Sequence, residues 1–347
     1  MKIGFDVSDL CTGRADGTTR YTGELAKRLP NLKPEHEWLY FAPCNVSDAM
    51  ASPWPRWWTQ TRLPFDLYRF KPDVMFMPIQ QIPYLRPGKM KTVAVVHDLA
   101  VHLFPEQFRY KDWLLLHVFS AYVAREADEI IAVSQATAND IALYYNRTNR
   151  VHVVHHGVDH EKFKVTDDEI NLPGLKKPYI LYVGQLQPRK NLTRLVKAFE
   201  VLKKSEAELQ LVIAGGHGWL KQPILEAIKK SPAAKDILLP GVVPDNLLPA
   251  LYSQAEVFVL PSLYEGFGMP ILEAMACGCP VVTSNVSSMP EVAGEAAVLV
   301  KPTDVESIAN GIKEALNKKE DLMTKGLKRA KQFDWDITSR KVLEILL

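Results

Sequence analysis

Apolar residues along this chain fall into short runs with strand character, and stretches with helical periodicity lie between them. This alternation from end to end predicts βαβ units and parallel sheets, and therefore an α/β fold. In the first half the predicted strands are residues 2–7, 38–42, 73–77, 92–96, 129–133 and 151–154. In the second half they are residues 179–184, 209–214, 237–239, 257–260, 280–283 and 297–300.

Helices are predicted between these strands. Residues 21–29 and 136–145 are amphipathic, and residues 192–203 place their apolar side chains on one face. A last helix is predicted from about residue 336 to residue 347. The polar passage 159–177 contains proline and glycine and has the composition of a linker.

These elements predict two Rossmann-like, doubly wound parallel-sheet domains. We expect an N-terminal domain over residues 1–165, a C-terminal domain over residues 166–334, and a separate final helix over residues 335–347. Open parallel sheets bind ligands at the carboxyl ends of their strands, and two such domains facing each other leave a central cleft. The chemistry is therefore expected in the loops that follow strands.

The composition is that of a soluble globular protein. A length of 347 residues suits two domains, and 47% hydrophobic with 24% charged residues can bury a substantial core. Forty-two Lys and Arg against forty Asp and Glu leave a formal charge of +2, which argues against a strongly basic nucleic-acid binder.

The cysteines and the apolar segments indicate a cytoplasmic protein. Cys11, Cys44, Cys277 and Cys279 match no zinc-ligand spacing, so we expect reduced thiols. The N-terminus reads as a first strand and not as a signal peptide. The most apolar internal stretch, 113–124, is well short of the roughly 20 residues that cross a bilayer. At most, peripheral contact with the inner face of the plasma membrane is expected.

The loop after the predicted strand 257–260 combines two glycines, a proline and two acids. Gly266 and Gly268 allow close approach of a ligand to the backbone, and Pro270 suits the first turn of a helix that stops before Gly278. Glu265 in the loop and Glu273 in the helix are suited to accept hydrogen bonds from sugar and ribose hydroxyls. The alternative is a surface helix with two solvated glutamates.

A basic pair follows the predicted strand 179–184. Arg189 and Lys190 precede a helix for which Asn191 is a good N-cap. A guanidinium and an ammonium beside a helix N-terminus make an anion site that suits a leaving diphosphate. The alternative is an exposed basic pair at a turn.

Two further loops in the first half carry candidate residues. His97 and Asp98 follow the strand 92–96, where His97 is suited to hydrogen-bond a sugar. Asp98 either orients His97 or is a turn residue. The loop 12–21 contains only Gly13 and Gly17 and lacks the dinucleotide pattern Gly-x-Gly-x-x-Gly.

The pair Glu265 and Glu273, with seven residues between, followed by Ala-Met-Ala-Cys-Gly-Cys-Pro-Val-Val at residues 274–282, resembles the donor-site signature of retaining glycosyltransferases of family four. That family has the two-domain fold called GT-B. The resemblance covers nearly the whole chain and is strongest in the second half. Val-His-Asp-Leu at residues 96–99 and Phe-Pro-Glu at residues 104–106 are similar to a bacterial subgroup that includes mannosyltransferases of surface-polysaccharide assembly.

The resemblance implies a role for each site residue. It implies that the N-terminal domain holds the acceptor and the C-terminal domain holds the nucleotide sugar, with the final helix returning to the first domain. The implied catalytic residues are His97, Arg189, Lys190 and Glu265. The implied donor-binding residues are Gly17, Thr18, Gly184, Gly215, Val243, Gly266, Phe267, Gly268, Met269, Leu272 and Glu273. Asp98, Arg20 and Tyr21 are expected near the acceptor or the transferred sugar.

The implied activity is retaining, metal-independent hexosyl transfer from a nucleotide sugar, without a further cofactor. GDP-mannose is the expected donor by subgroup resemblance, and a lipid-linked or growing surface-polysaccharide glycan is the expected acceptor. UDP and dTDP sugars would use the same motifs. Front-face transfer assisted by Arg189 and Lys190 is expected, and double displacement through a carboxylate is the alternative.

Three other interpretations assign the chain to a different functional class. A non-catalytic nucleotide-sugar-binding subunit would not need Glu265, Arg189 and Lys190, and a hydrolysing GT-B epimerase would form product without an acceptor. A nicotinamide oxidoreductase is disfavoured by the missing dinucleotide pattern. The adjacent His155 and His156 are expected to point to opposite faces of a strand, and we assign no metal.

One basic aromatic stretch contains Trp54, Trp57 and Trp58, interleaved with arginines. Trp and Arg favour membrane interfaces, so the stretch is a candidate for peripheral membrane contact or for a lipid-linked acceptor. The favoured interpretation is an amphipathic helix whose aromatic side chains face the protein's own sheet.

Overall fold

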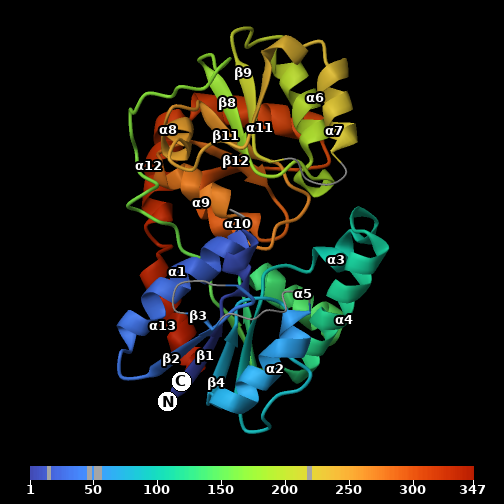
Figure 1. Ribbon diagram of the computed structural model, residues 1–347. Helices are drawn as coiled ribbons and strands as arrows, with labels where there is room; N and C mark the ends of the chain where they lie inside the picture. The colour runs from blue at the N-terminus through green and yellow to red at the C-terminus, as the bar shows by residue number, and fades with distance from the viewer. Residues whose placement is uncertain (14–16, 45–48, 51–56, 217–220) are drawn as a thin grey trace. The chain divides into compact units, whose positions relative to one another are not determined.

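The computed structural model describes residues 1–13, 17–44, 49–50, 57–216 and 221–347. The chain forms two units, one made of Met1–Gly157 with Trp335–Leu347 and the other of Val158–Asp334 (Figure 1). The division falls between residues 157 and 158, eight residues before the expected boundary after residue 165. The polar passage 159–177 thus belongs to the second unit.

The first unit contains a parallel sheet, seven strands wide within the described residues. Its strand order is β3-β2-β1-β4-β5-β6-β7, and each pairing is parallel. Because both faces are covered by helices, the central strands are almost continuously apolar, as in β5. The strands are β1 (Lys2–Asp6), β2 (Glu37–Phe41), β3 (Ala49–Met50), β4 (Val74–Met77), β5 (Lys91–Val96), β6 (Glu129–Ala132) and β7 (Val151–Val153).

Helices lie on both faces of this sheet (Figure 1). One face is covered by α1 (Gly17–Leu32) and α13 (Trp335–Leu346). The other is covered by α2 (Trp58–Phe70), α4 (Tyr110–Glu126) and α5 (Gln135–Tyr145), which pack on alternate strand residues such as Met75 and Met77. Shorter elements are η1 (Ser8–Thr12), α3 (Ala100–Leu103) and η2 (Pro105–Gln107).

The final helix packs within the first unit. Arg28 on α1 donates from Nε to Asp336 Oδ1 at 2.9 Å, and Lys91 Nζ donates to the carbonyl oxygen of Ile345 at 2.6 Å. Trp335 is buried at its start, with its ring centroid 5.9 Å from that of Tyr21. The chain therefore leaves the first unit at residue 157 and re-enters it at residue 335.

The second unit has a six-stranded parallel sheet in the order β10-β9-β8-β11-β12-β13. Its strands are β8 (Tyr179–Val183), β9 (Gln210–Ala214), β10 (Ile237–Gly241), β11 (Val257–Leu260), β12 (Val281–Ser284) and β13 (Ala297–Val300). Its helices are α6 (Leu192–Leu202), α7 (Gln222–Lys230), α8 (Leu248–Ser253), α9 (Met269–Ala276), α10 (Met289–Ala293), α11 (Val305–Asn317) and α12 (Lys319–Ala330). Single turns of 3-10 helix are η3 (Pro188–Lys190), η4 (Ala234–Asp236) and η5 (Gly294–Ala296).

The predicted strands are all present, with ends within two residues of those expected. The two-residue strand β3 was not predicted, because it is too short to carry an apolar pattern. β10 extends two residues beyond its prediction, and its register with β9 shifts between Leu238 and Gly241. Among the described residues, no helix is both long and apolar enough to cross a membrane.

The expectation of four reduced thiols is wrong in the structure. Cys11 and Cys44 form a disulfide with their Cα atoms 5.8 Å apart, while Cys277 and Cys279 are free and buried. Cys11 follows β1 and Cys44 follows β2. These parallel neighbours place their following loops side by side, a relationship that spacing along the sequence does not reveal.

The favoured interpretation of the basic aromatic stretch is only partly correct. Trp58, the first residue of α2, is buried in the core, as expected for an amphipathic helix. Trp57 is instead exposed, and so are Phe65 and Tyr68 of α2, which the prediction did not cover. Trp54 lies outside the described residues.

Candidate functional site

The loop between β11 and α9 has the conformation that its glycines and proline predict. Gly268 has a φ of 98°, in the left-handed region that favours glycine, and immediately precedes α9. Pro270 lies in the first turn, where its missing N–H breaks no helical hydrogen bond. Gly278 has a φ of 70° just beyond the helix end. The loop is thus held between a buried strand and a short, buried helix.

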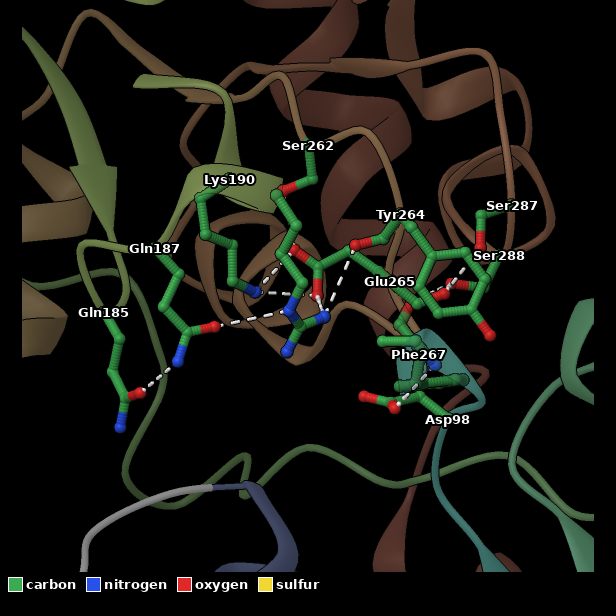
Figure 2. A network of polar contacts seen from close by, with 12 residues as sticks. Asp98, Gln185, Gln187, Lys190, Ser262, Tyr264, Glu265, Phe267, Ser287 and Ser288 are labelled. Carbon is green, nitrogen blue, oxygen red and sulfur yellow. Dashed lines mark hydrogen bonds and ion pairs between the residues drawn. The ribbon is translucent and has the colours of Figure 1, made fainter. Parts of the chain in front are cut away.

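Glu265 is the centre of the polar network in this loop (Figure 2). Lys190 Nζ donates to its two carboxylate oxygens at 2.6 and 2.7 Å, and Ser262 Oγ donates to Oε1 at 2.6 Å. Arg189 Nη1 lies 3.6 Å from Oε2. Burial by itself would raise the pKa of Glu265, but the two cations and the hydrogen bonds from Lys190 and Ser262 outweigh it and lower that pKa. The carboxylate is therefore ionised at neutral pH.

Arg189 and Lys190 form η3, between β8 and α6. The loop between β11 and α9, residues 261–268, is called the glutamate loop below. The main chain of Arg189 is fixed to it, because the Arg189 carbonyl oxygen accepts from Leu263 N at 2.8 Å. Its side chain donates from Nη1 to the carbonyl oxygen of Tyr264 at 3.4 Å and from Nε to Gln187 Oε1 at 3.3 Å. Two loops far apart in sequence are thereby joined at the carboxyl edge of the sheet.

Asn191 stands at the N-cap position of α6, but its side chain does not cap the helix as expected. It has a φ of 62°, and its Nδ2 donates to the carbonyl oxygens of Pro261 at 2.9 Å and Pro302 at 2.6 Å. The amide therefore ties η3 to the loops after β11 and β13.

Charge and burial together make this cluster a candidate anion site. The side chains of Arg189, Lys190 and Glu265 are all largely buried. Two cations and one carboxylate leave one positive charge in excess among the three. Buried charge is costly unless it is paired, so a bound anion would stabilise the cluster. This supports the anion-site prediction and not an exposed basic pair.

Glu273 lies on α9 and is also buried. Its Oε2 accepts a hydrogen bond from the hydroxyl of Tyr252 on α8 at 3.0 Å. The surface helix with two solvated glutamates is therefore the wrong interpretation, because both carboxylates are enclosed. Of the neighbouring candidate residues, Gly266, Phe267, Gly268 and Leu272 are buried and Met269 is half-buried.

The ends of β8 and β9 approach each other as only glycine permits. Gly184 and Gly215 have φ values of 153° and 147°, and a Cβ on Gly215 would lie 1.9 Å from the carbonyl oxygen of Gly184. Val243, in the loop after β10, is buried. Tyr182 donates to the carbonyl oxygen of Gln185 at 3.1 Å, and burial followed by the Glu265 carboxylate raises its pKa well above the usual range.

His97 belongs to an aromatic cluster in the first unit. Its Nε2 donates to the carbonyl oxygen of Pro78 at 2.7 Å, and its ring lies 5.2 Å from Tyr21 and 5.5 Å from His156 by centroid distance. Burial is the main cause that lowers the pKa of His156 well below its usual value, and the neighbouring His97 and His155 lower it further. His156 is therefore a neutral imidazole. Burial raises the pKa of Tyr21.

The other candidate residues of the first unit lie in the loops after β5 and β1. Asp98 Oδ1 accepts from the backbone N–H of Ala100 at 3.1 Å, the geometry of a turn residue at the start of α3. Gly17, Thr18 and Arg20 lie in the first turn of α1. Residues 14–16 of the predicted glycine loop lie outside the described residues.

His155 and His156 follow the end of β7, and so do not alternate on a strand as expected. His156 is buried and His155 is half-buried. Across the part of the chain that the structure describes, no group of three or more His, Cys, Asp or Glu residues is placed to hold a metal ion.

Several residues of the site are not among those predicted from the sequence. Ser262 precedes Glu265 by three residues, a spacing that points to a turn contact. Gln187 donates from Nε2 to Gln185 Oε1 at 2.7 Å, and Ser287 and Ser288 contact the glutamate loop from the loop after β12. No local signal identifies these two serines, because only the sheet order brings them to Glu265.

Two family models match the chain. The model described as Glycosyl transferases group 1 matches residues 164–333, and the model described as Glycosyltransferase Family 4 matches residues 15–162. The "O-antigen chain mannosyltransferase B" of Escherichia coli is 34% identical over 73% of this chain and 69% of its own length. The "Serotype-specific mannosyltransferase WbdA" of Escherichia coli is 30% identical over 77% of this chain, which spans about a third (34%) of that protein.

Solved structures share the fold. The Anabaena protein Alr3699/HepE in complex with UDP and glucose superposes with a TM-score of 0.77, covering 99% of this chain and 98% of its own, at 18% identity. The prediction of two doubly wound parallel-sheet domains of the GT-B fold is confirmed.

Proposed function

The chain belongs to the glycosyltransferases of group 1 and family 4, and we propose that it transfers mannose from GDP-mannose with retention of configuration. The proposed acceptor is a glycan or lipid-linked glycan of bacterial surface polysaccharide, such as an O-antigen, capsule or exopolysaccharide. The mannosyltransferase names of its relatives support the donor sugar and the acceptor class. Glycosyl transfer follows from membership of the family. The donor, the acceptor and the stereochemistry of transfer are our proposals.

The observation that carries the proposal is the buried cluster of Arg189, Lys190 and Glu265, with one positive charge in excess. Arg189 and Lys190 would hold the diphosphate and stabilise the charge that develops on its leaving oxygen. Glu265 would accept a hydrogen bond from a hydroxyl of the transferred sugar. Lys190 would then share its donors between the carboxylate and the phosphate.

The proposed reaction is a front-face transfer. The bond between the anomeric carbon and the β-phosphate oxygen breaks, and the acceptor oxygen bonds to that carbon on the same face. The acceptor proton moves to the departing phosphate oxygen, which leaves as the nucleoside diphosphate. The two cations supply the charge stabilisation, so the step requires no metal ion.

The rest of the donor would lie along the same sheet edge. Glu273 would bind the ribose hydroxyls, which would compete with Tyr252 for its carboxylate. The close approach of Gly184 and Gly215 exposes backbone, and with Val243 it would accommodate the nucleotide. Gly266, Phe267, Gly268, Met269 and Leu272 would line the donor sugar.

The first unit would supply the acceptor side. Nε2 of His97 donates to a carbonyl oxygen, so in the neutral form of the ring Nδ1 would be the acceptor atom for a sugar hydroxyl. We also place five residues of the first unit near the diphosphate, the acceptor or the transferred sugar: Gly17, Thr18, Arg20, Tyr21 and Asp98.

Peripheral membrane contact by the first unit is part of the proposal. Trp57, Phe65 and Tyr68 expose 58%, 74% and 54% of their surface, at and along the outer face of α2. Arg69, in the same helix, lies with its Cζ 5.1 Å from the ring centroid of Phe70. Aromatic side chains beside arginine favour the headgroup region of a bilayer, where a lipid-linked acceptor would be presented. The protein would then work at the cytoplasmic face of the membrane.

Calorimetric titration with GDP, UDP and dTDP, first without metal and then with magnesium, tests the proposal. Selective, metal-independent binding of GDP is expected. Selective binding of UDP or dTDP would keep the site and overturn the donor. Binding of a nucleoside diphosphate without transfer to any acceptor would favour the non-catalytic subunit, and absence of binding to all three would overturn the proposed site. Product formed from GDP-mannose without any acceptor would indicate the epimerase instead.

A further inference from the structure

Two adjacent serines hold the main chain of the glutamate loop from outside it (Figure 2). Ser287 and Ser288 lie between β12 and α10. The Oγ atoms of Ser287 and Ser288 donate to the carbonyl oxygen of Glu265 at 2.6 and 2.9 Å, respectively. Ser288 Oγ also lies 2.9 Å from the carbonyl oxygen of Phe267, so its one hydroxyl hydrogen is shared between two carbonyls.

These contacts set the direction of two peptide groups. In a trans peptide the C=O and the following N–H point in opposite directions. With the carbonyls of Glu265 and Phe267 directed at the serines, the N–H groups of Gly266 and Gly268 are directed away from them. The serines therefore orient two backbone donors in the same loop that carries the Glu265 carboxylate.

The backbone of Ser287 carries a conformational cost. Its φ is 57°, in the left-handed region that disfavours a side chain. Residues held in such conformations are maintained by their surroundings and cluster at functional sites. Here the left-handed turn places the hydroxyl on the Glu265 carbonyl oxygen, and Ser288 beside it is fully buried.

We infer that Ser287 and Ser288 are positioning residues for recognition of the donor sugar, an inference that rests on the proposed function. Their hydroxyls hold the peptides of Glu265 and Phe267 so that the Glu265 carboxylate and the Gly268 N–H group are presented together. The nucleoside diphosphate is held by other residues. The serines thus contribute to binding of the hexose and not of the free nucleotide.

Three variants test the inference: Ser288→Ala, Ser287→Ala and Ser287→Gly. The matched control is Ser284→Ala. Ser284 is the last residue of β12 and is buried, and its hydroxyl has no hydrogen-bond partner among the described residues. Ser287→Gly removes the hydroxyl but accepts the positive φ, whereas Ser287→Ala removes the hydroxyl and keeps the conformational cost. Comparing these two variants separates loss of the hydrogen bond from backbone strain.

The measurements are dissociation constants for GDP and GDP-mannose, kcat and KM for transfer, and thermal stability. In Ser288→Ala we expect donor affinity and kcat/KM to fall roughly tenfold, with GDP affinity within about twofold of the parent. Ser287→Gly and Ser287→Ala are expected to lose donor affinity equally, with Gly the more stable. Ser284→Ala should keep every value.

Two results would overturn the inference. Donor and GDP affinities that fall together would show that the serines only maintain the fold, and a donor affinity unchanged in all variants would remove them from the site. If the parent binds no nucleoside diphosphate, the proposed function itself fails, and that outcome is separate from both.

Discussion

Lys190 donates to both carboxylate oxygens of Glu265, at 2.6 and 2.7 Å, although the two residues are 75 positions apart in the chain. The pair lies where the loops after β8 and β11 meet, because these strands are neighbours in the parallel sheet. A buried carboxylate and a buried ammonium satisfy each other before any donor binds. The pair therefore links the stability of the second unit to its proposed catalytic function.

Lys190→Ala is expected to lower kcat/KM for transfer by about 100-fold or more, because it removes a charge that would stabilise the leaving diphosphate. Lys203→Ala is the matched control, since Lys203 is a partly buried lysine of the same unit, paired with Asp236 at 3.0 Å. It should keep transfer activity. A Lys190→Ala enzyme within a few-fold of the parent in steady-state kinetics would contradict the assignment.

Glu273→Gln is expected to weaken binding of the free nucleoside diphosphate by roughly tenfold, because an amide replaces the carboxylate proposed to accept from the ribose. Tyr252→Phe removes only the hydroxyl that now donates to Glu273, so it should keep or improve that affinity. Calorimetric titration measures both. An unchanged affinity in Glu273→Gln would remove this residue from the site.

Asp6 makes stability depend on pH in a direction that can be measured. It ends β1, and burial raises its pKa from 3.8 to about 6. Because the pKa of Asp6 is raised in the folded state, the contribution of this carboxyl group to the free energy of unfolding is full below pH 3.8. That contribution is lost as the pH rises through about 6. The free energy of unfolding of Asp6→Asn, relative to that of the parent, should therefore increase by about 1 kcal/mol as the pH is raised from 5 to 8. Urea unfolding across this range measures the difference, and a constant difference would refute it.

Reduction of the disulfide is expected to destabilise the first unit. Cys11 and Cys44 are 33 residues apart, and closing a loop of this length removes about 3 to 4 kcal/mol of chain entropy from the unfolded state. Cys44→Ser should lower the melting temperature of the oxidised protein to that of the reduced protein. Under denaturing, non-reducing conditions the oxidised parent should show two reactive thiols, Cys277 and Cys279. Four reactive thiols would mean that the disulfide is absent.

Binding to anionic vesicles tests the proposed membrane contact. Phe65→Ser and Tyr68→Ser together should weaken co-sedimentation with vesicles containing phosphatidylglycerol about tenfold or more, because they remove exposed aromatic surface from α2. Leu143→Ser, on the exposed side of α5, is the control. Equal co-sedimentation of the parent and the double variant would exclude this face as the contact.

Local pattern was sufficient for the elements and for the main motif. Continuous apolar runs bounded by turn residues located the strands of both sheets, because a parallel sheet covered on both faces needs apolar residues at nearly every position. In the β11–α9 loop, glycine and proline at particular offsets determined where the strand ends and the helix begins. Glu265 and Glu273 could be singled out because they share this one segment.

Contacts between distant segments could not be read in the same way. The chain does not show that Ser287 and Ser288 reach the Glu265 carbonyl, that Cys11 reaches Cys44, or that the Asn191 amide bridges two loops instead of capping its helix. The sequence also did not show that Trp57 is exposed while Trp58 is buried, because composition does not tell which side chains of a helix meet the sheet.

The sequence alone determined the alternation of strands and helices, the family, and the residue types at the ends of the strands. These depend on local backbone preference and hydrophobic period, which each segment carries within itself. Only the tertiary structure decided which of those residues meet, because strand order brings together loops that are tens of residues apart. The buried Lys190–Glu265 pair, and the serines that hold its loop, exist only once β8, β11 and β12 lie side by side.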